Sequence, residues 1–415
     1  MATILPFRAL CPNPTLVDKI AALPYDVLST KEARDIAANN PHCFLFITKP
    51  EIDFTDDVNH YSETVYARGA KNLQRFIREY KLLQEKEPYY YLYQQIMGDH
   101  VQTGFVGIAS VDEYDRGIIK KHEYTRPEKV NDRVHLMSRL KAQTGPVFLA
   151  YRQNDKMAAL VSMLLSKSRK IYDFISFYDV RHIFYKVDHP PFNEIIRSSF
   201  AELPTLYIAD GHHRSESAAV LCRQKRQEQP NFTGEESYNF FLTVTFPHTD
   251  LLVLPYNRVV RDLNGYTAQT LLEKLKEKFV LTPITEHFES LISSKTFAMY
   301  MNKQWFKLAI KKEYVHTTDA VKSLDVSILQ DNILHPLLGI ENPRMDERID
   351  FIGGIRGVRE LERLVGSGVY AVAFALFPTS MQQVMDVADA GTVMPPKSTW
   401  FEPKLLSGLA THLLD

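Results

Sequence analysis

The sequence predicts an α+β protein with mixed sheets. Helical and strand-like segments follow one another with many hairpins and few βαβ units, which favours this class over a regular α/β fold. Of the 415 residues, 45% are hydrophobic and 24% are charged, as in ordinary globular proteins. The length fits ~2–3 domains, although the sequence contains no internal repeat or low-complexity linker that would mark a boundary.

The N-terminal part contains two helices and a hairpin that can be predicted from local patterns. A helix is expected to begin at Ser29 or Thr30, either of which can cap it. Residues 61–87 carry apolar side chains at helical spacing, and Pro88 is expected to end this long helix. Residues 89–114 consist of two β-rich runs around a Gly-Asp turn, which predicts a hairpin. The elements expected next are a helix at 133–145, strands at 145–153 and 174–188, and a helix at 192–203.

A strand at 205–210 is predicted to lead into a helix at 215–228. This helix carries a narrow face of small residues, which suits close packing on a sheet: Ser215, Ala218, Ala219 and Cys222. The elements expected after it are strands at 238–246 and 251–260, a helix at 268–279, a hairpin turning at 301–303, a strand at 368–377, a helix at 381–391, and a loop with a short strand at 391–409.

The composition narrows the function classes. A formal net charge of −1 provides no overall basic field, so nucleic acid is not an expected partner. The three cysteines (Cys11, Cys43 and Cys222) form no CxxC pair and suit a reducing cytosol. The first residues do not show the pattern of a signal peptide, and no stretch reaches the ~18 uninterrupted apolar residues of a membrane span. We therefore expect a cytoplasmic protein without a membrane partner.

The most titratable cluster of the chain lies at the expected strand-to-helix junction, in TLYIADGHHRSESAA at residues 205–219. The first N–H groups of a helix lack intrahelical partners and carry a partial positive charge, so they stabilise an anion. Gly211 allows close approach of the backbone to a ligand, and Arg214 suits a phosphate or carboxylate. The two histidines can donate hydrogen bonds, relay protons or bind a metal. The predicted residues for binding a nucleotide phosphate are Gly211, His212, His213, Arg214 and Ser215.

Asp210 would repel a bare phosphate unless a divalent cation lay between them. Mg²⁺ is usually held by one or two carboxylates together with substrate phosphates, so Asp210 is the predicted metal ligand. Two other interpretations stay open. Asp210 can be an ordinary helix cap beside ordinary histidines, or the cluster can hold zinc with further ligands from elsewhere in the chain.

Several segments resemble known families. YIADGHHRSESA resembles the DGHHR element of the ParB/sulfiredoxin-like fold, in the branch that includes free-serine kinases. The hallmark segments of domain of unknown function family 1015 are similar to LPYDVLSTKEAR, HEYTRPEKVNDR, DGHHRSESA, LPYNRVV and MPPKSTWFEPKLLSGL, which together span nearly the full length. The resemblance implies a ParB/sulfiredoxin-like nucleotide-site region with inserted hairpins at 1–262, and a C-terminal α+β region packed against it at 263–415.

The same resemblance narrows the chemistry that is implied. A sulfiredoxin would carry a cysteine where this chain has His212, which argues against peroxide chemistry. ParB proteins couple their nucleotide site to a DNA-binding helix-turn-helix, and this sequence shows no convincing basic recognition helix. What remains implied is a Mg²⁺-dependent kinase that moves a phosphoryl group from ATP or ADP to a small hydroxyl compound, plausibly free L-serine.

Phosphoryl transfer usually needs a carboxylate near the attacking hydroxyl. In the related kinases it comes from the N-terminal part of the domain, where PYDV offers Asp26, and a turn or cap aspartate is the alternative interpretation. The predicted catalytic residues are Asp26, His212 and His213.

Other charged residues are candidate ligands for the substrate. HEYTRPEKVNDR supplies Glu123, Arg126 and Arg133, and both arginines suit a phosphate or a substrate carboxylate. Part of this segment can equally be a solvated loop or helix start. Arg258 follows a predicted strand and Lys397 lies on a proline-stiffened loop, where a sheet edge and a surface turn are the alternatives.

We expect a small-molecule substrate and a nucleotide as binding partners, and the sequence is compatible with a homodimer. Two other functions stay open. One is a ParB-like nucleotide-binding regulatory module without efficient catalysis. The other is a metal-dependent hydrolase that uses Asp210, His212 and His213.

Overall fold

The computed structural model describes residues 1–284, 293–316 and 318–414. The chain divides into two compact units: unit 1 is Met1–Leu251 with Pro403–Asp415, and unit 2 is Leu252–Glu402. The C-terminal tail therefore belongs with the N-terminal part of the chain. The two units are distinguished only by their compactness. The domain boundary predicted after residue 262 therefore stays a prediction.

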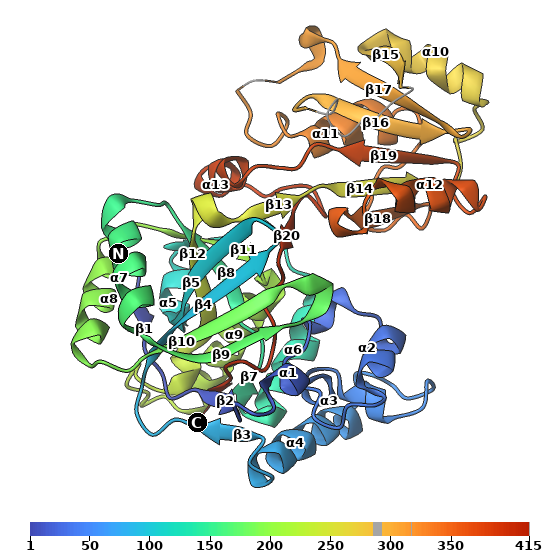
Figure 1. Cartoon of the computed structure of the whole chain (residues 1–415). Helices are drawn as coiled ribbons and strands as arrows, with labels where there is room; N and C mark the ends of the chain where they lie inside the picture. Colours follow the sequence, from blue (N-terminus) through green and yellow to red (C-terminus); the bar gives the residue numbers. More distant parts are fainter. Residues whose placement is uncertain (285–292, 317, 415) are drawn as a thin grey trace. The chain divides into compact units, whose positions relative to one another are not determined.

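Unit 1 is built on a nine-stranded mixed sheet (Figure 1). Its order is β6-β11-β8-β12-β5-β4-β10-β9, and β1 pairs with β5. β11 runs parallel to β6 and β12 runs parallel to β8, whereas the other neighbours are antiparallel. The strands are β1 (Ile4–Leu5), β4 (Tyr90–Met97), β5 (His100–Ser110), β6 (Ile119–Lys120), β8 (Val147–Tyr151), β9 (Arg169–Ile175), β10 (Arg181–Val187), β11 (Leu206–Asp210) and β12 (Phe240–Pro247). The predicted α+β class is confirmed.

The hairpin predicted at 89–114 is confirmed, and the segment 174–188 predicted as strand also lies in a hairpin. In the hairpin at 89–114, β4 and β5 pair antiparallel and turn at Gly98, whose φ is 58°. In the segment 174–188, β9 and β10 pair antiparallel, and Tyr178 and Asp179 have positive φ at the turn. Both tips depend on left-handed backbone, which glycine adopts most easily.

The helices of unit 1 divide between two apolar cores. Helices α5, α7, α8 and α9 pack on the large sheet, whereas α2, α3, α4 and α6 form a second core near the N-terminus. The helices are α1 (Val17–Ile20), α2 (Thr30–Ala37), α3 (Leu45–Thr48), α4 (Glu63–Arg78), α5 (Val111–Asp115), α6 (Pro127–Leu140), α7 (Asp155–Lys167), α8 (Pro191–Ala201) and α9 (His212–Glu228). Two short strand pairs complete the unit, β2 (Leu10–Pro12) with β3 (Leu82–Gln84) and β7 (Ala142–Gln143) with β21 (His412–Leu413). Among the described residues, no helix combines the length and the apolar character needed to cross a membrane.

One predicted helix is confirmed at its start, and another is wrong at its end. The N-cap of α2 is Ser29, whose Oγ accepts from the Glu32 N–H at 3.2 Å while the Glu32 carboxylate accepts from the Ser29 N–H at 2.8 Å. The helix predicted at 61–87 ends early, because Tyr80 has a φ of 53° and β3 follows it. The pairing of β3 with β2 therefore overrides the helical pattern of this segment.

Unit 2 contains a six-stranded antiparallel sheet in the order β15-β17-β16-β19-β14-β18. Its strands are β14 (Tyr256–Val260), β15 (Phe279–Ile284), β16 (Thr296–Met301), β17 (Gln304–Ile310), β18 (Ile349–Gly353) and β19 (Val372–Leu376), and β13 (Leu252–Leu254) pairs separately with β20 (Trp400–Glu402). The helices are α10 (Ala268–Lys278), α11 (Asp325–Leu329), α12 (Val358–Gly366) and α13 (Met381–Asp389). The predicted hairpin at 301–303 is confirmed, whereas the strand predicted at 251–260 is divided by Pro255 between two sheets.

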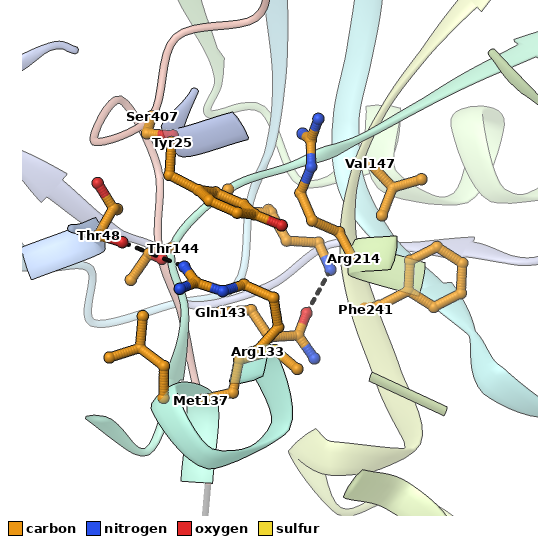
Figure 2. Close-up of a pocket in the computed structure, with 13 residues that line it drawn as sticks. Tyr25, Thr48, Arg133, Met137, Gln143, Thr144, Val147, Arg214, Phe241 and Ser407 are labelled. Atoms are coloured by element: carbon orange, nitrogen blue, oxygen red, sulfur yellow. Dashed lines mark hydrogen bonds between the residues drawn. The ribbon is translucent and has the colours of Figure 1, made fainter. Parts of the chain in front are cut away.

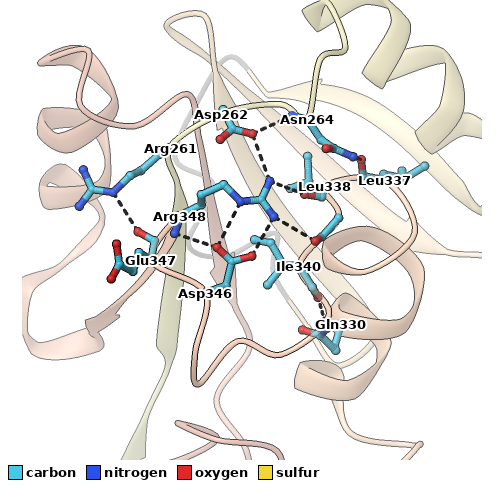
Figure 3. A network of polar contacts seen from close by, with 11 residues as sticks. Arg261, Asp262, Asn264, Gln330, Leu337, Leu338, Ile340, Asp346, Glu347 and Arg348 are labelled. Carbon is cyan, nitrogen blue, oxygen red and sulfur yellow. Dashed lines mark hydrogen bonds and ion pairs between the residues drawn. The ribbon is translucent and has the colours of Figure 1, made fainter.

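Arg348 stabilises the irregular segment that precedes β18 (Figure 3). Its guanidinium donates to both carboxylate oxygens of Asp346, at 3.2 and 2.8 Å. It also donates to the carbonyls of Leu338 at 3.2 Å and Gly339 at 2.9 Å. Asp262, at the end of β14, accepts from the same guanidinium at 3.4 Å. One side chain thus satisfies two carbonyl groups that lie outside any helix or strand.

His182 makes the stability of unit 1 depend on pH. It lies in β10, its side chain is buried, and its Nδ1 is 2.6 Å from the Tyr93 hydroxyl. Burial lowers the pKa of His182 to about 3, whereas an unfolded histidine titrates near about 6.5. Between these two values the unfolded chain binds the additional proton, so stability falls as the pH falls through this window.

We predict that the unmodified protein loses free energy of unfolding when the pH is lowered from about 7.5 to about 5. The His182→Gln variant should lose about 2 kcal/mol less over the same change of pH. Glutamine keeps a polar partner for Tyr93 but cannot take up a proton. Urea denaturation followed by circular dichroism at both pH values measures the difference. Equal losses in the two proteins would contradict the assignment.

Candidate functional site

The site is built at the turn from β11 to α9. The register of β11 against β8 shifts between Ile208 and Asp210, which is a bulge of the kind that re-aims a side chain. Gly211 follows with a φ of 95°, and a Cβ there would lie 3.2 Å from the guanidinium carbon of Arg214. The turn brings Asp210 and Arg214 together, with 3.7 Å between Oδ1 and Nη2. The predicted strand–DGHHR–helix junction is confirmed.

Arg214 connects three segments of unit 1. Its side chain is 10% exposed, and its Nη2 lies 3.6 Å from Oδ2 of Asp26. Its Nη1 donates to the carbonyl of Pro146, which precedes β8. Burial opposes the charge of the guanidinium, but Asp26 and Asp210 raise the pKa of Arg214. The predicted base, Asp26, and the predicted metal ligand, Asp210, therefore share one cation.

Lys404, in the C-terminal tail, balances the charge of Asp210. Its Nζ lies 3.1 Å from Asp210 Oδ2, and the two side chains are 10% and 30% exposed. Burial acts to raise the pKa of Asp210, but Lys404 and Arg214 hold it below its ordinary range. The other oxygen, Oδ1, accepts from the Gly211 N–H at 2.7 Å. Asp210 is therefore an ionised carboxylate with both oxygens in use.

The residues around Asp210 suit only a metal ion that needs few protein ligands. In the part of the chain that the structure describes, no three histidine, cysteine, aspartate or glutamate side chains gather as a metal site would need. A Mg²⁺ ion that is mostly ligated by substrate phosphates and water needs only one or two protein carboxylates. Asp210 fits such an ion as its one protein carboxylate, and Lys404 competes with the ion for Asp210.

His212 and His213 hold the segment 122–126 against α9. The His122 N–H donates to His212 Nε2 at 3.3 Å, and the Arg126 N–H donates to His213 Nε2 at 3.1 Å. The rings of His122 and His212 meet edge to face, with 4.4 Å between their centroids. The two predicted site segments, DGHHR and HEYTRPEKVNDR, are therefore brought together by their histidines.

Burial keeps the imidazoles of His122 and His212 neutral. It lowers the pKa of His122 to about 4 and, together with the neighbouring His122, lowers the pKa of His212 well below its ordinary value. Because Nε2 of His212 accepts a hydrogen bond, its proton is on Nδ1, which lies 3.9 Å from Oε2 of Glu123. A neutral ring offers no positive charge to a phosphate, so that role falls to Arg214 and Lys404.

A pocket lies beside Arg214 (Figure 2). Its polar lining comes from Tyr25, Thr48, Arg133, Gln143, Thr144, Arg214 and Ser407, and its apolar lining from Leu136, Met137, Val147, Phe241 and Leu242. The guanidinium carbon of Arg133 lies 4.0 Å from the ring centroid of Tyr25. The same guanidinium donates to Asp132 at 2.9 and 2.6 Å and to the Thr48 carbonyl at 3.1 Å. Arg133 thus forms a fixed, charge-paired wall of the pocket.

The structure places other predicted residues of unit 1 differently. Ser215 is buried, and its hydroxyl donates to the His212 carbonyl at 3.0 Å within α9. The side chain of Arg126 is 56% exposed and lies 4.0 Å from that of Glu128. The backbone N–H of Arg126 contacts the DGHHR turn.

Arg258 and Lys397 belong to unit 2. Arg258 is 3% exposed, and burial lowers its pKa to about 10. It donates to the Tyr256 carbonyl and, at 3.0 Å, to the Lys397 carbonyl. Lys397 has a φ of 57°, so Arg258 fixes a loop at a residue with left-handed backbone. Their predicted contact with a substrate stays a prediction.

The predicted small-residue face of α9 is confirmed. Ser215, Ala218, Ala219 and Cys222 are each at most 2% exposed. Burial raises the pKa of the Cys222 thiol to about 11, which removes it from the range of reactive thiolates. The cysteine of α9 therefore packs within the apolar core on the sheet.

Comparison with known proteins identifies the family to which the chain belongs. The family model described as "Protein of unknown function (DUF1015)" matches residues 4–327. This chain belongs to the DUF1015 family. The family resemblance is confirmed for the four resembling segments within the match, whereas MPPKSTWFEPKLLSGL at 394–409 lies beyond it. No curated protein matches this DUF1015 chain.

Several solved structures are distantly similar to this DUF1015 protein. A free serine kinase variant in complex with AMP is 14% identical, with a TM-score of 0.36, and the match covers 71% of this chain and 87% of that chain. A conserved hypothetical protein from Pyrococcus furiosus is 12% identical, with a TM-score of 0.34 and coverage of 71% and 90%. SbnI with a C-terminal truncation, from Staphylococcus aureus, is 12% identical, with a TM-score of 0.38 and coverage of 72% and 85%.

Sequence reasoning missed Lys404 and most of the lining of the pocket, of which it predicted only Arg133 and Arg214. Lys404 stands in MPPKSTWFEPKLLSGL, the same resembling segment from which Lys397 was chosen. The signal was therefore present, but no local pattern distinguishes the two lysines. The contact of Lys404 with Asp210 spans 194 positions of sequence.

We predict that Lys404 and Asp210 are energetically coupled in this DUF1015 protein. Lys404→Met and Asp210→Asn should each lower the free energy of unfolding by about 2 kcal/mol, because each leaves a partly buried charge without its partner. The double variant should lose less than the sum, with a coupling of about 1–3 kcal/mol measured by urea denaturation.

The matched control for this cycle is the exposed pair Lys156–Glu202 of unit 1, whose side chains are 53% and 62% exposed. A coupling of about 0.5 kcal/mol or less is expected there. If the Lys404–Asp210 coupling were no larger than that of the control pair, Lys404 would not be balancing Asp210.

Proposed function

We propose that unit 1 is a nucleotide-dependent phosphotransferase that acts on the hydroxyl group of a small molecule. The observation that carries this proposal is the sharing of Arg214 by Asp26 and Asp210 at the start of α9. Phosphoryl transfer depends mainly on positioning and charge stabilisation. A helix start, a nine-tenths buried arginine and a second cation, Lys404, supply both beside the carboxylate of Asp26.

Asp26 is the proposed base. Its side chain is 36% exposed, so an incoming hydroxyl can reach it. In the transfer, the hydroxyl oxygen forms a bond to the terminal phosphorus of the nucleotide, and the bond from that phosphorus to the bridging oxygen breaks. The hydroxyl proton passes to Asp26, and the nucleotide leaves with one phosphate fewer. Arg214 and the first N–H groups of α9 stabilise the charge on the transferred group.

We further propose ATP or ADP as the phosphoryl donor and Mg²⁺ as the ion that accompanies its phosphates. Asp210 would hold this ion, and when bound it would neutralise phosphate charge near the carboxylates. The proposed roles of the histidines are positional, because His212 and His213 fasten the segment 122–126 beside the turn. We also propose that β6, β8 and β11 with α9 form a ParB/sulfiredoxin-like core.

The test is incubation of the full chain with ATP or ADP, Mg²⁺ and a panel of amino acids and other small hydroxyl compounds, with phosphorylated product detected by phosphorus NMR. We predict turnover of at least one compound, and a loss of at least about 100-fold in kcat for Asp26→Asn. Binding of the nucleotide, measured by thermal shift, should survive this substitution, because Arg214 and the α9 turn remain.

Asp56→Asn serves as the control, because the Asp56 side chain is 88% exposed and pairs only with Arg34 among the ion pairs of the described residues. Its activity should match that of the unmodified protein. No turnover of any compound, together with no thermal shift by either nucleotide, would overturn the proposal. A nucleotide-dependent shift without turnover would instead identify a regulatory module.

A further inference from the structure

We propose that Gln95 is a positioning residue of the candidate site. Through a hydrogen bond to the carbonyl of Lys404, its side chain sets where the ammonium group of that lysine lies beside Asp210. The inference rests on the proposed function only where a nucleotide is the probe. The positioning of Lys404 itself rests on contacts within unit 1.

Three polar side chains form a row across adjacent strands of the large sheet. Gln95 in β4 lies opposite His182 in β10 and opposite Gln102 in β5. Gln95 and Gln102 are fully buried, and His182 is 2% exposed. Glutamine is mostly an exposed residue, and burying a polar side chain costs free energy unless it is hydrogen-bonded. Two fully buried amides side by side therefore need a reason other than apolar packing.

The hydrogen bonds of this row direct Gln95 toward the C-terminal tail. Gln102 Nε2 donates to Gln95 Oε1 at 2.8 Å. The amide nitrogen of Gln95 then donates to the carbonyl of Lys404 at 2.9 Å, across 309 positions of sequence. Because a carbonyl can only accept, the amide of Gln95 has one orientation that satisfies both partners. Gln102 therefore selects the end of Gln95 that faces Lys404.

A second residue of β4 holds the same stretch of the tail. Tyr93 is 1% exposed, and its hydroxyl lies 2.6 Å from His182 Nδ1. Burial raises the pKa of Tyr93, and a hydrogen bond with the backbone of Leu406 opposes that rise. Residues two positions apart in a strand point to the same face of the sheet. Tyr93 and Gln95 therefore hold residues 404 and 406 on one face of the sheet.

The fixed backbone of Lys404 matters because its side chain is long. Lysine carries its ammonium group on a flexible four-carbon stem. Here Nζ lies 3.1 Å from Oδ2 of Asp210, and the lysine side chain is 10% exposed. The Gly211 N–H holds the other carboxylate oxygen of Asp210 at 2.7 Å. With both ends of the stem fixed, a shift of the backbone at residue 404 would move the ammonium group away from the carboxylate.

The Lys404–Asp210 double-mutant cycle, repeated in the Gln95→Met background, tests this role without any ligand. Methionine has a similar shape but no donor. We predict that the coupling falls to about half or less of its value in the unmodified background. Tyr90→Phe is the matched control, because Tyr90 lies in the same strand, is fully buried and donates to the carbonyl of Ile4 in β1 at 2.6 Å. It should leave the coupling unchanged.

Gln95→Asn is a second variant, which keeps an amide in the buried row in case methionine prevents folding. Its side chain is one methylene shorter and should not reach the Lys404 carbonyl, so the coupling should fall in this background as well. An unchanged coupling in the Gln95 variants would overturn the inference. An equal fall in Tyr90→Phe would also overturn it, because a general loosening of the sheet would then explain the loss.

Binding of ATP with Mg²⁺, measured by isothermal titration calorimetry, extends the test to the proposed function. Gln95→Met should weaken binding about tenfold, but less than about twofold in the Lys404→Met background, since the effect passes through that lysine. A purely structural role would give the same factor in both backgrounds and would refute the positioning role. If the unmodified protein binds no nucleotide, the phosphotransferase proposal fails, while the coupling measurement still decides the role of Gln95.

Discussion

Arg214 is the side chain on which the arrangement of the site depends. It lies 3.6 Å from the carboxylate of Asp26, 3.7 Å from that of Asp210, and donates to the carbonyl that precedes β8. Its guanidinium rests on Gly211, where a Cβ would approach to 3.2 Å. The position of the Arg214 guanidinium thus depends on the bulge in β11 and on the positive φ of Gly211. Asp26 comes from a distant segment, and Arg214 is what brings it to the start of α9.

The local features of the fold could be predicted from sequence, because their causes are local. The hairpins turn at residues that accept positive φ, and the start of α2 carries a capping box at Ser29. Helix α7 was not predicted, although Asn154 caps it and its buried residues recur at helical spacing. The return of the C-terminal tail could not be predicted, because it depends on pairings such as that of β21 with β7, which no local pattern announces.

The sequence predicted which segments form the candidate site better than it predicted the contacts between them. Asp26, DGHHR and HEYTRPEKVNDR do meet in unit 1, yet the roles that residue types suggested are partly different. His212 and His213 are acceptors for backbone N–H groups, and burial favours the neutral ring of His212. Lys404 could not be predicted because its partner, Asp210, is distant in sequence. Lys397 lies on a proline-rich loop of the same segment, which is a local pattern that favours an exposed lysine.

The most direct measurement of the central claim, that one nucleotide site joins these three segments, is hydrogen–deuterium exchange of the full chain with and without ATP and Mg²⁺. The account predicts that peptides covering residues 24–28, 206–216 and 403–408 become protected together, because Asp26, the start of α9 and Lys404 contact one another through Arg214 and Asp210. Peptides of the β9–β10 hairpin, which shares no residue with this cluster, should be unchanged. Protection elsewhere in the chain, or at only one of the three segments, would contradict the account.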